Sequence, residues 1–242
     1  MQIIRLLSIL LAIIFVQGCA TYTSEQEARA INLPELGSII QTRGNFWYAT
    51  SERVGTPEWG TPLVVDVQEV PFTKNTYGNY SAYMGKASRI NGIAYVDSLP
   101  YKPKYLRLQL ADKIAVVQQL NSTKNGPVRD YLATDHDYKV VTSLDITLTD
   151  ALMPKFLSAA KVTLCENAQW GKHLLFIIDK KEERVPFSEI QVFDYSYASL
   201  CWGEDRYHNK RVETLLPGNN ACPKGTYKKA AKVGSDKSYL KF

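Results

Sequence analysis

YLRLQL, residues 105–110, decides the fold class, because a leucine stands at every second position. Successive side chains of a β-strand point to opposite faces of the sheet, so Leu106, Leu108 and Leu110 are predicted to face the core. The stretch LDITL at 144–148 alternates in the same way. Sheets with one face on the core and one in water pair mainly antiparallel, which disfavours a parallel dinucleotide-binding sheet.

Two more strands and one helix complete the predicted core. Residues 63–68 alternate as well, and 190–197 forms a further strand. Residues 150–160 place apolar side chains on one stripe, which predicts a helix capped by Thr149 or Asp150. We therefore expect an α+β fold, predominantly antiparallel β-sheet with a helix near 150–160. An all-β sandwich is the alternative.

The second half of the chain has the pattern of a meander. Residues 162–165 and 173–178 flank the turn-like segment 167–171, which predicts a hairpin. Residues 180–184 form a charged turn. The aromatic-rich stretch 72–105 fits either short strands with exposed rings or a long loop region over one end of the sheet.

The first residues carry the features of an export signal. A basic start at Met1 to Arg5 precedes an apolar run at 6–16, and the small residue Gly18 follows. This is the layout of a secretory signal peptide, and the run is shorter than the roughly 20 apolar residues of a membrane span. A retained transmembrane anchor is the alternative.

VQGC at residues 16–19 resembles the lipobox of bacterial lipoproteins, a resemblance that covers only residues 1–20. It implies cleavage between Gly18 and Cys19, with diacylglycerol and a further acyl chain such as palmitate on Cys19. Several acyl chains on one residue attach a protein firmly to a membrane. Ala20, where inner-membrane lipoproteins often carry Asp, implies an outer-membrane location facing the periplasm.

The chain divides into four expected segments. They are a signal peptide at 1–18, a lipidated tether with a short helix at 19–44, a globular β-rich domain at 45–223, and a basic C-terminal tail at 224–242. Turn residues near 121–127 allow a subdivision of the domain. Removal of residues 1–18 from the 242-residue chain leaves 224 residues, enough for one good core or two small ones.

The common catalytic signatures are missing from the sequence: there is no G-x-S-x-G, H-E-x-x-H, phosphate-binding loop or G-x-G-x-x-G motif. Asp135, His136 and Asp137 form the most suggestive cluster, for which we prefer a polar turn over a metal or acid–base role. His173 is expected to pack in a strand and His208 to be solvated. We therefore assign no catalytic residue, metal site or cofactor, and an enzyme is not favoured.

Three cysteines remain once Cys19 is set aside for lipidation. Cys201 and Cys222 bracket a polar, loop-like segment, so a disulfide between them is the favoured pairing in an oxidising compartment. Pairing of Cys165 with Cys201 or with Cys222 is the alternative. In the favoured scheme Cys165 is a small buried hydrophobe.

The net charge of +5 is concentrated at the C-terminal end. Residues 201–242 hold nine basic and four acidic side chains, so the rest of the mature chain is close to neutral. The candidate contacts for an anionic envelope surface are Lys224, Lys228, Lys229, Lys232, Lys237 and Lys241. A solvated tail is the alternative interpretation.

The leading functional hypothesis is a non-enzymatic envelope lipoprotein, an accessory, assembly or binding factor with an envelope protein as partner. The second is a glycan- or wall-binding module that stacks sugars on exposed rings of Trp47, Trp59, Tyr77, Tyr80 and Tyr83. The third is a hydrolase of envelope polymers, which requires a cleft where two of these residues meet: Asp135, His136, Asp137, Asp145 or His208. Nucleic acid is not an expected partner, because export separates the chain from it.

Overall fold

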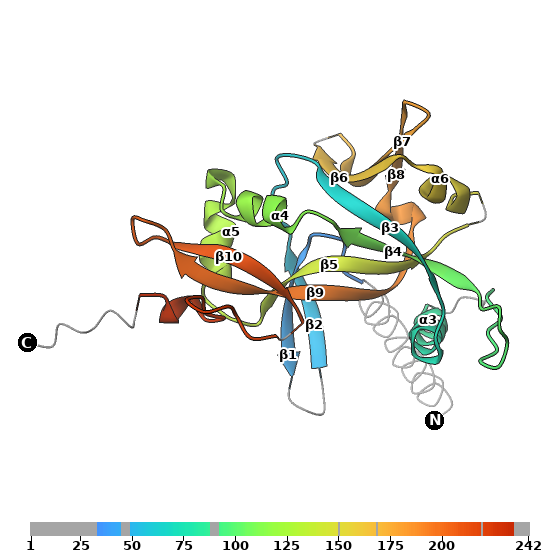
Figure 1. Ribbon diagram of the computed structural model, residues 1–242, viewed down its shortest axis with the longest axis horizontal. Coiled ribbons are helices and arrows are strands. Elements are labelled where there is room, and N and C mark those ends of the chain that lie inside the picture. Colours follow the sequence, from blue (N-terminus) through green and yellow to red (C-terminus); the bar gives the residue numbers. More distant parts are fainter. Residues whose placement is uncertain are drawn as a thin grey trace, which may run out of the picture.

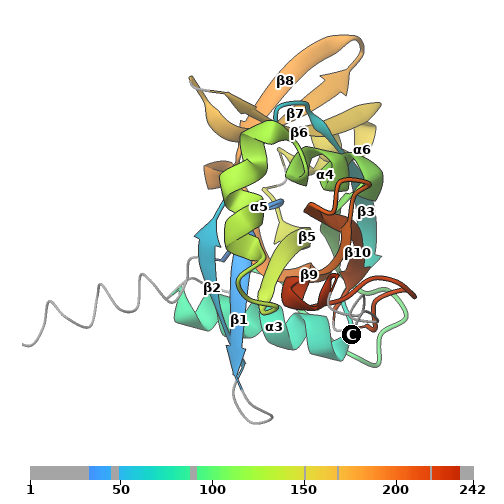
Figure 2. The ribbon, with the colours of Figure 1, turned by 90° about the vertical axis from the view of Figure 1, so that its left-hand side faces the viewer.

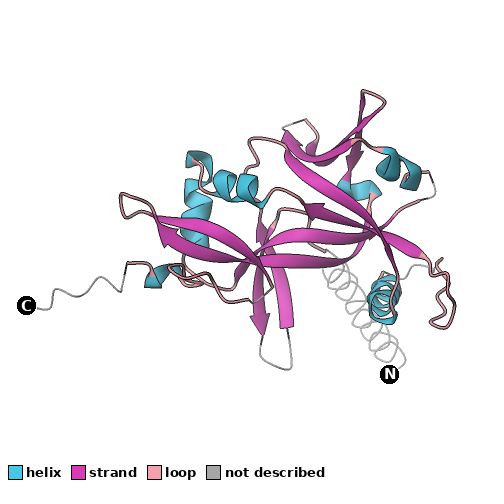
Figure 3. Ribbon diagram, viewed as in Figure 1, coloured by secondary structure: helices cyan, strands magenta, loops and turns pink. Residues whose placement is uncertain are grey.

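The computed structural model describes residues 33–44, 49–87, 92–149, 151–167, 169–218 and 220–234. Ten strands within these ranges form one hydrogen-bonded sheet, and all the pairings between them are antiparallel. The expected antiparallel, β-rich fold with a few helices is therefore confirmed (Figure 3). The sandwich alternative is wrong, because the strands join in one open sheet rather than two stacked ones.

The strands are β1 (Ile39–Gly44), β2 (Ala49–Gly55), β3 (Leu63–Pro71), β4 (Lys104–Leu110), β5 (Tyr138–Thr147), β6 (Lys161–Asn167), β7 (Gly171–Ile178), β8 (Lys181–Pro186), β9 (Gln191–Glu204) and β10 (Lys210–Pro217). Their order is β10-β9-β5-β4-β3-β6-β7-β8, with β1 paired to β2 and β5 (Figure 1). Strand β5 is central, because it pairs with β9 along one side and with β1 and then β4 along the other.

The helices are α3 (Lys74–Lys86), α4 (Lys113–Leu120), α5 (Gly126–Leu132) and α6 (Met153–Ser158), with 3₁₀ turns at Thr123–Asn125, Phe187–Glu189 and Ala230–Lys232. Helices α4 and α5 lie on one side of the central strands and α3 lies on the other (Figures 1 and 2). Among the described residues, no helix has the length and apolar character needed to cross a membrane.

The main core lies on one face of the sheet, where the alternating leucines point inward as predicted. Leu106, Leu108 and Leu110 of β4 are at most 2% exposed. Leu144 and Ile146 of β5 share that face, because they pair with Leu108 and Leu106 in register. Helices α4 and α5 add buried apolar side chains to the same cluster.

A separate aromatic cluster lies on the opposite face, at the end of the sheet that α3 covers. The ring centroid of Tyr105 is 4.9 Å from that of Phe72 and 5.3 Å from that of Phe193. Tyr80 and Met84 of α3 close the cluster from outside the sheet. Helix α3 therefore protects only this end of the face, and the rest of the face carries polar side chains.

The stretch 72–105 contains a helix where short strands or a long loop were expected. Helix α3 begins with a capping box, in which Thr73 and Thr76 each accept from the other's backbone N–H. Gly78 and Gly85 lie within the helix. The helix was missed because these glycines and many tyrosines weaken the local helix signal, while burial of Tyr80 and Met84 stabilises the helix. Residues 92–103 contain no helix or strand, in keeping with the loop interpretation.

The predicted helix near 150–160 is present as α6 but is shorter, and its cap differs. Its N-cap is Leu152, without a side-chain cap bond, so the predicted Thr149 cap is wrong. Thr149 instead contributes its carbonyl, which accepts from the backbone N–H groups of Leu152 and Met153. Pro154 lies in the first turn, where its missing N–H costs little.

The meander of the second half is largely confirmed. Strands β6 and β7 form the predicted hairpin, and β9 contains the predicted strand 190–197 from residue 191 onward. The charged turn is confined to Asp179 and Lys180, both with positive φ, because residues 181–184 belong to β8. Residues 121–127 carry helical turns between the neighbouring strands β4 and β5.

Both ends of the described chain belong to the folded body. Strand β1 lies within the range 19–44 that was assigned to the tether, so the sheet begins before residue 45; the expected helix near Ser24 lies outside the described residues. At the other end, Ala230 is 3% exposed. Tyr227 exchanges two backbone hydrogen bonds with Trp202 of β9. The range 224–234 is therefore attached to the sheet at Tyr227 and Ala230, while the lysines at 224, 229 and 232 are exposed.

Candidate functional site: a polar groove on the open face of the sheet

A row of neutral polar side chains crosses β4, β5 and β9 on the face opposite the main core. Gln109 pairs in register with Ser143, and Ser143 pairs with Ser196. Residues directly opposite each other on neighbouring strands share a face, so the three side chains are adjacent. They line a groove of about 400 Å³, which we call the polar groove; Arg107 and Lys113 also line it.

A bulge in β5 shapes the floor of the polar groove. The register between β5 and β9 shifts between Val141 and Ser143, which makes Thr142 an extra residue. A bulge increases the local twist and redirects side chains, and for this reason Thr142 and Ser143 both line the groove although they are consecutive. Tyr195 and Tyr197 of β9 also line the groove, although their rings pack against the main core on the other face of the sheet.

Ser143 is the most informative residue of the polar groove. Its side chain is 7% exposed, and its hydroxyl oxygen is buried without a hydrogen-bond partner in the described part of the chain. Burial of an unpaired hydroxyl costs roughly 1–3 kcal/mol, so folded proteins rarely retain one. An unpaired hydroxyl at the floor of a groove is a hydrogen-bonding group that a ligand can satisfy.

Arg107 is fixed in place beside this row. Its Nε donates to Asp145 Oδ1 at 2.7 Å and its Nη2 donates to Asp145 Oδ2 at 2.8 Å, a bidentate pair across β4 and β5. Nη2 also donates to the hydroxyl of Tyr105 at 2.9 Å. The hydrogen bond to Asp145 raises the pKa of Arg107, and burial raises the pKa of Tyr105 to about 12. The guanidinium is therefore a rigid, permanent cation.

Two donors of the groove have no protein acceptor among the described residues. The bonds of Arg107 use Nε and Nη2, which leaves the two hydrogens of Nη1. Lys113 is the first residue of α4, and its ammonium group is exposed. The neighbouring Asp112 caps the helix by accepting from Ala115 N–H at 2.9 Å. Arg107 and Lys113 are the charged residues that line the groove, and both are cationic.

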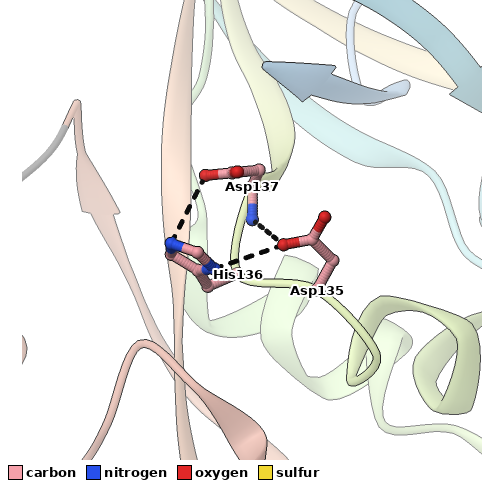
Figure 4. A group of neighbouring side chains, drawn as sticks. All are labelled: Asp135, His136 and Asp137. Atoms are coloured by element: carbon pink, nitrogen blue, oxygen red, sulfur yellow. Dashed lines mark hydrogen bonds and ion pairs between the residues drawn. The ribbon is translucent and has the colours of Figure 1, made fainter. Parts of the chain in front are cut away.

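The Asp135–His136–Asp137 cluster forms a compact turn (Figure 4). One ligand atom from each residue lies within 4.8 Å of the others, a spacing that a cation could use. However, His136 directs Nδ1 to Asp135 at 3.2 Å and Nε2 to Asp137 at 3.6 Å. The backbone N–H of Asp137 donates to Asp135, which lowers the pKa of that carboxyl.

A buried lysine supplies positive charge to the same turn. Lys139 is 3% exposed, and its Nζ donates to the carbonyl oxygen of His136 at 2.8 Å. Burial lowers the pKa of Lys139, while Asp137 and Asp135 oppose that shift. Because the two carboxylates face His136 and balance the charge of Lys139, the geometry favours the polar-turn interpretation.

The remaining hydrolase candidates are separated. Asp145 is bound to Arg107, and the Nδ1 of His208 lies 3.3 Å from Glu204 at the β9–β10 turn. His173 is 3% exposed, in keeping with the expected packed histidine, and its Nδ1 is 3.0 Å from the carbonyl of Gly171.

Two of the five rings proposed for glycan stacking are buried. Trp59 is 4% exposed and Tyr80 is 3% exposed, so neither presents a face to a ligand. Tyr77 and Tyr83 pack against the aromatic cluster under α3. Trp47 lies outside the described residues. Trp59 and Tyr80 were mistaken for surface rings because aromatic side chains are major components of both cores and interfaces, and the sequence does not show which rings are buried.

The structure joins Cys201 and Cys222 by a disulfide, which is the favoured pairing. Cys165 is unpaired and half-buried on β6, opposite His173 in the register. The lipidation site Cys19 and its neighbour Gly18 lie outside the described residues.

The predicted lysine patch is only partly described. Lys224, Lys229 and Lys232 are exposed, whereas Lys228 is half-buried. Lys228 lies close enough to Lys139 to lower its pKa. Lys237 and Lys241 lie outside the described residues.

The polar groove was not found from the sequence, although part of its signal was present. Alternation over 105–110 and 144–148 already implies that the side chains between the leucines face away from the core. The juxtaposition of Ser143 with Gln109 and Ser196 depends on strand pairing between distant segments, which alternation does not specify.

No protein-family model, curated protein or solved structure matches this chain. The functional argument therefore depends on the geometry of the groove and on the sequence features described above.

Proposed function

We propose that this protein is a lipid-anchored envelope protein of non-enzymatic function, which binds a polar ligand or partner in the polar groove. The lipobox resemblance at residues 16–19 supports the proposed location in the cell envelope. The buried, unpaired hydroxyl of Ser143 is the observation that carries the binding role. In this proposal the bound partner satisfies that hydroxyl and the free hydrogens on Arg107 Nη1.

Site-specific crosslinking in intact cells tests the proposal. A photoreactive amino acid at Ser196, which is exposed on the rim of the groove, should give a discrete adduct with the full-length, lipidated chain. The same amino acid at Tyr101, which is 91% exposed and does not line the groove, is the control and should give none. Identical adduct patterns from both positions would contradict a binding role for the groove.

Ser143→Ala separates a binding role from a structural one. Because the native hydroxyl has no partner among the described residues, its removal should leave the free energy of unfolding unchanged or raise it by up to about 1 kcal/mol. The yield of the Ser196 adduct should fall about fivefold, the cost of one lost hydrogen bond to the ligand. Urea unfolding and adduct quantification provide the two measurements.

Ser199→Ala is the matched control for this variant. Ser199 is 1% exposed, and its hydroxyl donates to the carbonyl of Gly218. Loss of that bond should lower the free energy of unfolding by about 1 kcal/mol. A Ser143→Ala variant that is equally destabilised, with an unchanged adduct yield, would show that Ser143 has a structural role.

A further inference from the structure

The charges of the polar groove all have one sign. Arg107 and Lys113 line it, and no carboxylate is among its lining residues. Asp145, opposite Arg107 in the register, occupies the Nε and Nη2 side of the guanidinium, and Asp194 also lies close enough to raise the pKa of Arg107. The hydrogens on Nη1 and the ammonium of Lys113 therefore remain available to an acceptor on the ligand.

The rest of the groove is neutral and rich in hydrogen-bonding groups. Gln109 offers both an amide donor and an amide acceptor, and Ser143 and Ser196 each offer a hydroxyl. A volume of about 400 Å³ is within the usual range for a small-molecule site.

We infer that the ligand of the polar groove is a small polyhydroxylated molecule that carries one oxyanion, with the oxyanion held between Arg107 and Lys113. Its hydroxyl groups bond to the row formed by Gln109, Ser143 and Ser196, and Ser143 thereby gains the partner that the described part of the chain does not supply. This inference rests on the proposed function, because it names the ligand class of the same groove. Carboxylate and phosphate share this chemistry.

Three sugars that differ only in their charged group test the ligand class. Glucuronate, glucose 6-phosphate and glucose are titrated into the full-length chain in detergent, and saturation-transfer NMR gives each dissociation constant. The two anions should bind about tenfold more tightly than glucose at low salt, and the difference should shrink in high salt. The ratio between the two anions identifies a sugar acid or a sugar phosphate as the closer match.

Lys113→Met tests whether the groove causes this preference. The variant should weaken binding of the two anions about fivefold and leave glucose binding unchanged, since only the charge contact is lost. Lys124→Met is the matched control, because Lys124 is exposed and does not line the groove. It should leave all three affinities unchanged.

The outcomes separate this inference from the proposed function. Equal binding of the three sugars, or no binding of either anion, overturns the anionic ligand class. If the Ser196 adduct still depends on Ser143 in that case, the groove remains a binding site for another class of partner. If the adduct is also independent of Ser143, the proposed function fails as well.

Discussion

At the scale of single residues, the Arg107–Asp145 pair differs from the other ion pairs of the sheet in its burial. The Asp145 side chain is 8% exposed and that of Arg107 is 35% exposed. By contrast, Lys104 and Glu69, which pair across β3 and β4, are 52% and 36% exposed. Exposed pairs contribute little because water and salt screen them, whereas a partly buried bidentate pair is costly to break.

Asp145→Asn should therefore destabilise the fold and disorder the groove. The neutral amide keeps the shape of the side chain but leaves the Arg107 cation without its counter-charge. We expect the free energy of unfolding to fall by about 2 kcal/mol, as measured by urea unfolding. Glu69→Gln is the control and should cost less than about 0.5 kcal/mol. Equal losses of unfolding free energy in the two variants would show that burial of the Arg107–Asp145 pair does not increase its contribution to stability.

At the scale of secondary-structure elements, the segment 220–234 acts as a strap along β9. The Cys201–Cys222 disulfide attaches its beginning, and the paired backbone bonds between Trp202 and Tyr227, at 2.8 and 2.9 Å, hold its middle. The disulfide closes a loop with a sequence separation of 21 residues, and such a loop restricts the unfolded chain.

Cys222→Ala should release this strap. Loss of the cross-link is expected to lower the free energy of unfolding by about 3 kcal/mol. Hydrogen exchange of the Tyr227 amide should become faster than in the native protein, because its bond to Trp202 opens locally. Cys165→Ala is the control, because it replaces a cysteine that forms no disulfide. Unchanged exchange at Tyr227 in Cys222→Ala would mean that the backbone bonds alone hold the strap.

At the scale of the whole molecule, the proposed anchor and the groove belong to different parts of the chain. The sheet begins at Ile39, and the expected lipid is attached at Cys19. Of the residues between Cys19 and Ile39, 20–32 lie outside the described structure. The groove is formed entirely by β4, β5, β9 and adjoining residues, so binding and anchoring should respond separately to mutation.

Cys19→Ser should release the protein from membranes without affecting the groove. A lipobox serine has no thiol to acylate, so the chain loses the acyl groups that hold it in the bilayer. Fractionation should move the protein from the membrane pellet to the soluble fraction, while sugar binding is retained. The control variant Cys165→Ser, which keeps Cys19, should stay in the membrane pellet. Retention of Cys19→Ser in the pellet would contradict the lipoprotein assignment.

The sequence predicted the elements whose signal is local. The leucines of 105–110, the hairpin of β6 and β7 and the Cys201–Cys222 pair each follow from residues close in the chain or from a short intervening loop. Helix α3 was missed because its propensity is weak, and it forms where Tyr80 and Met84 pack against the sheet.

By itself, the sequence determined which side chains of β4 face the core and which face away. Successive side chains of a strand point to opposite faces, and this period of two does not depend on any distant contact. Only the tertiary structure decided that Ser143 lies between Gln109 and Ser196 and that Asp145 faces Arg107. These neighbours are up to about 50 residues apart, and their register depends on strand pairing across the whole sheet. The groove is a product of that register, and so are its unpaired hydroxyl and the position of Arg107 beside it.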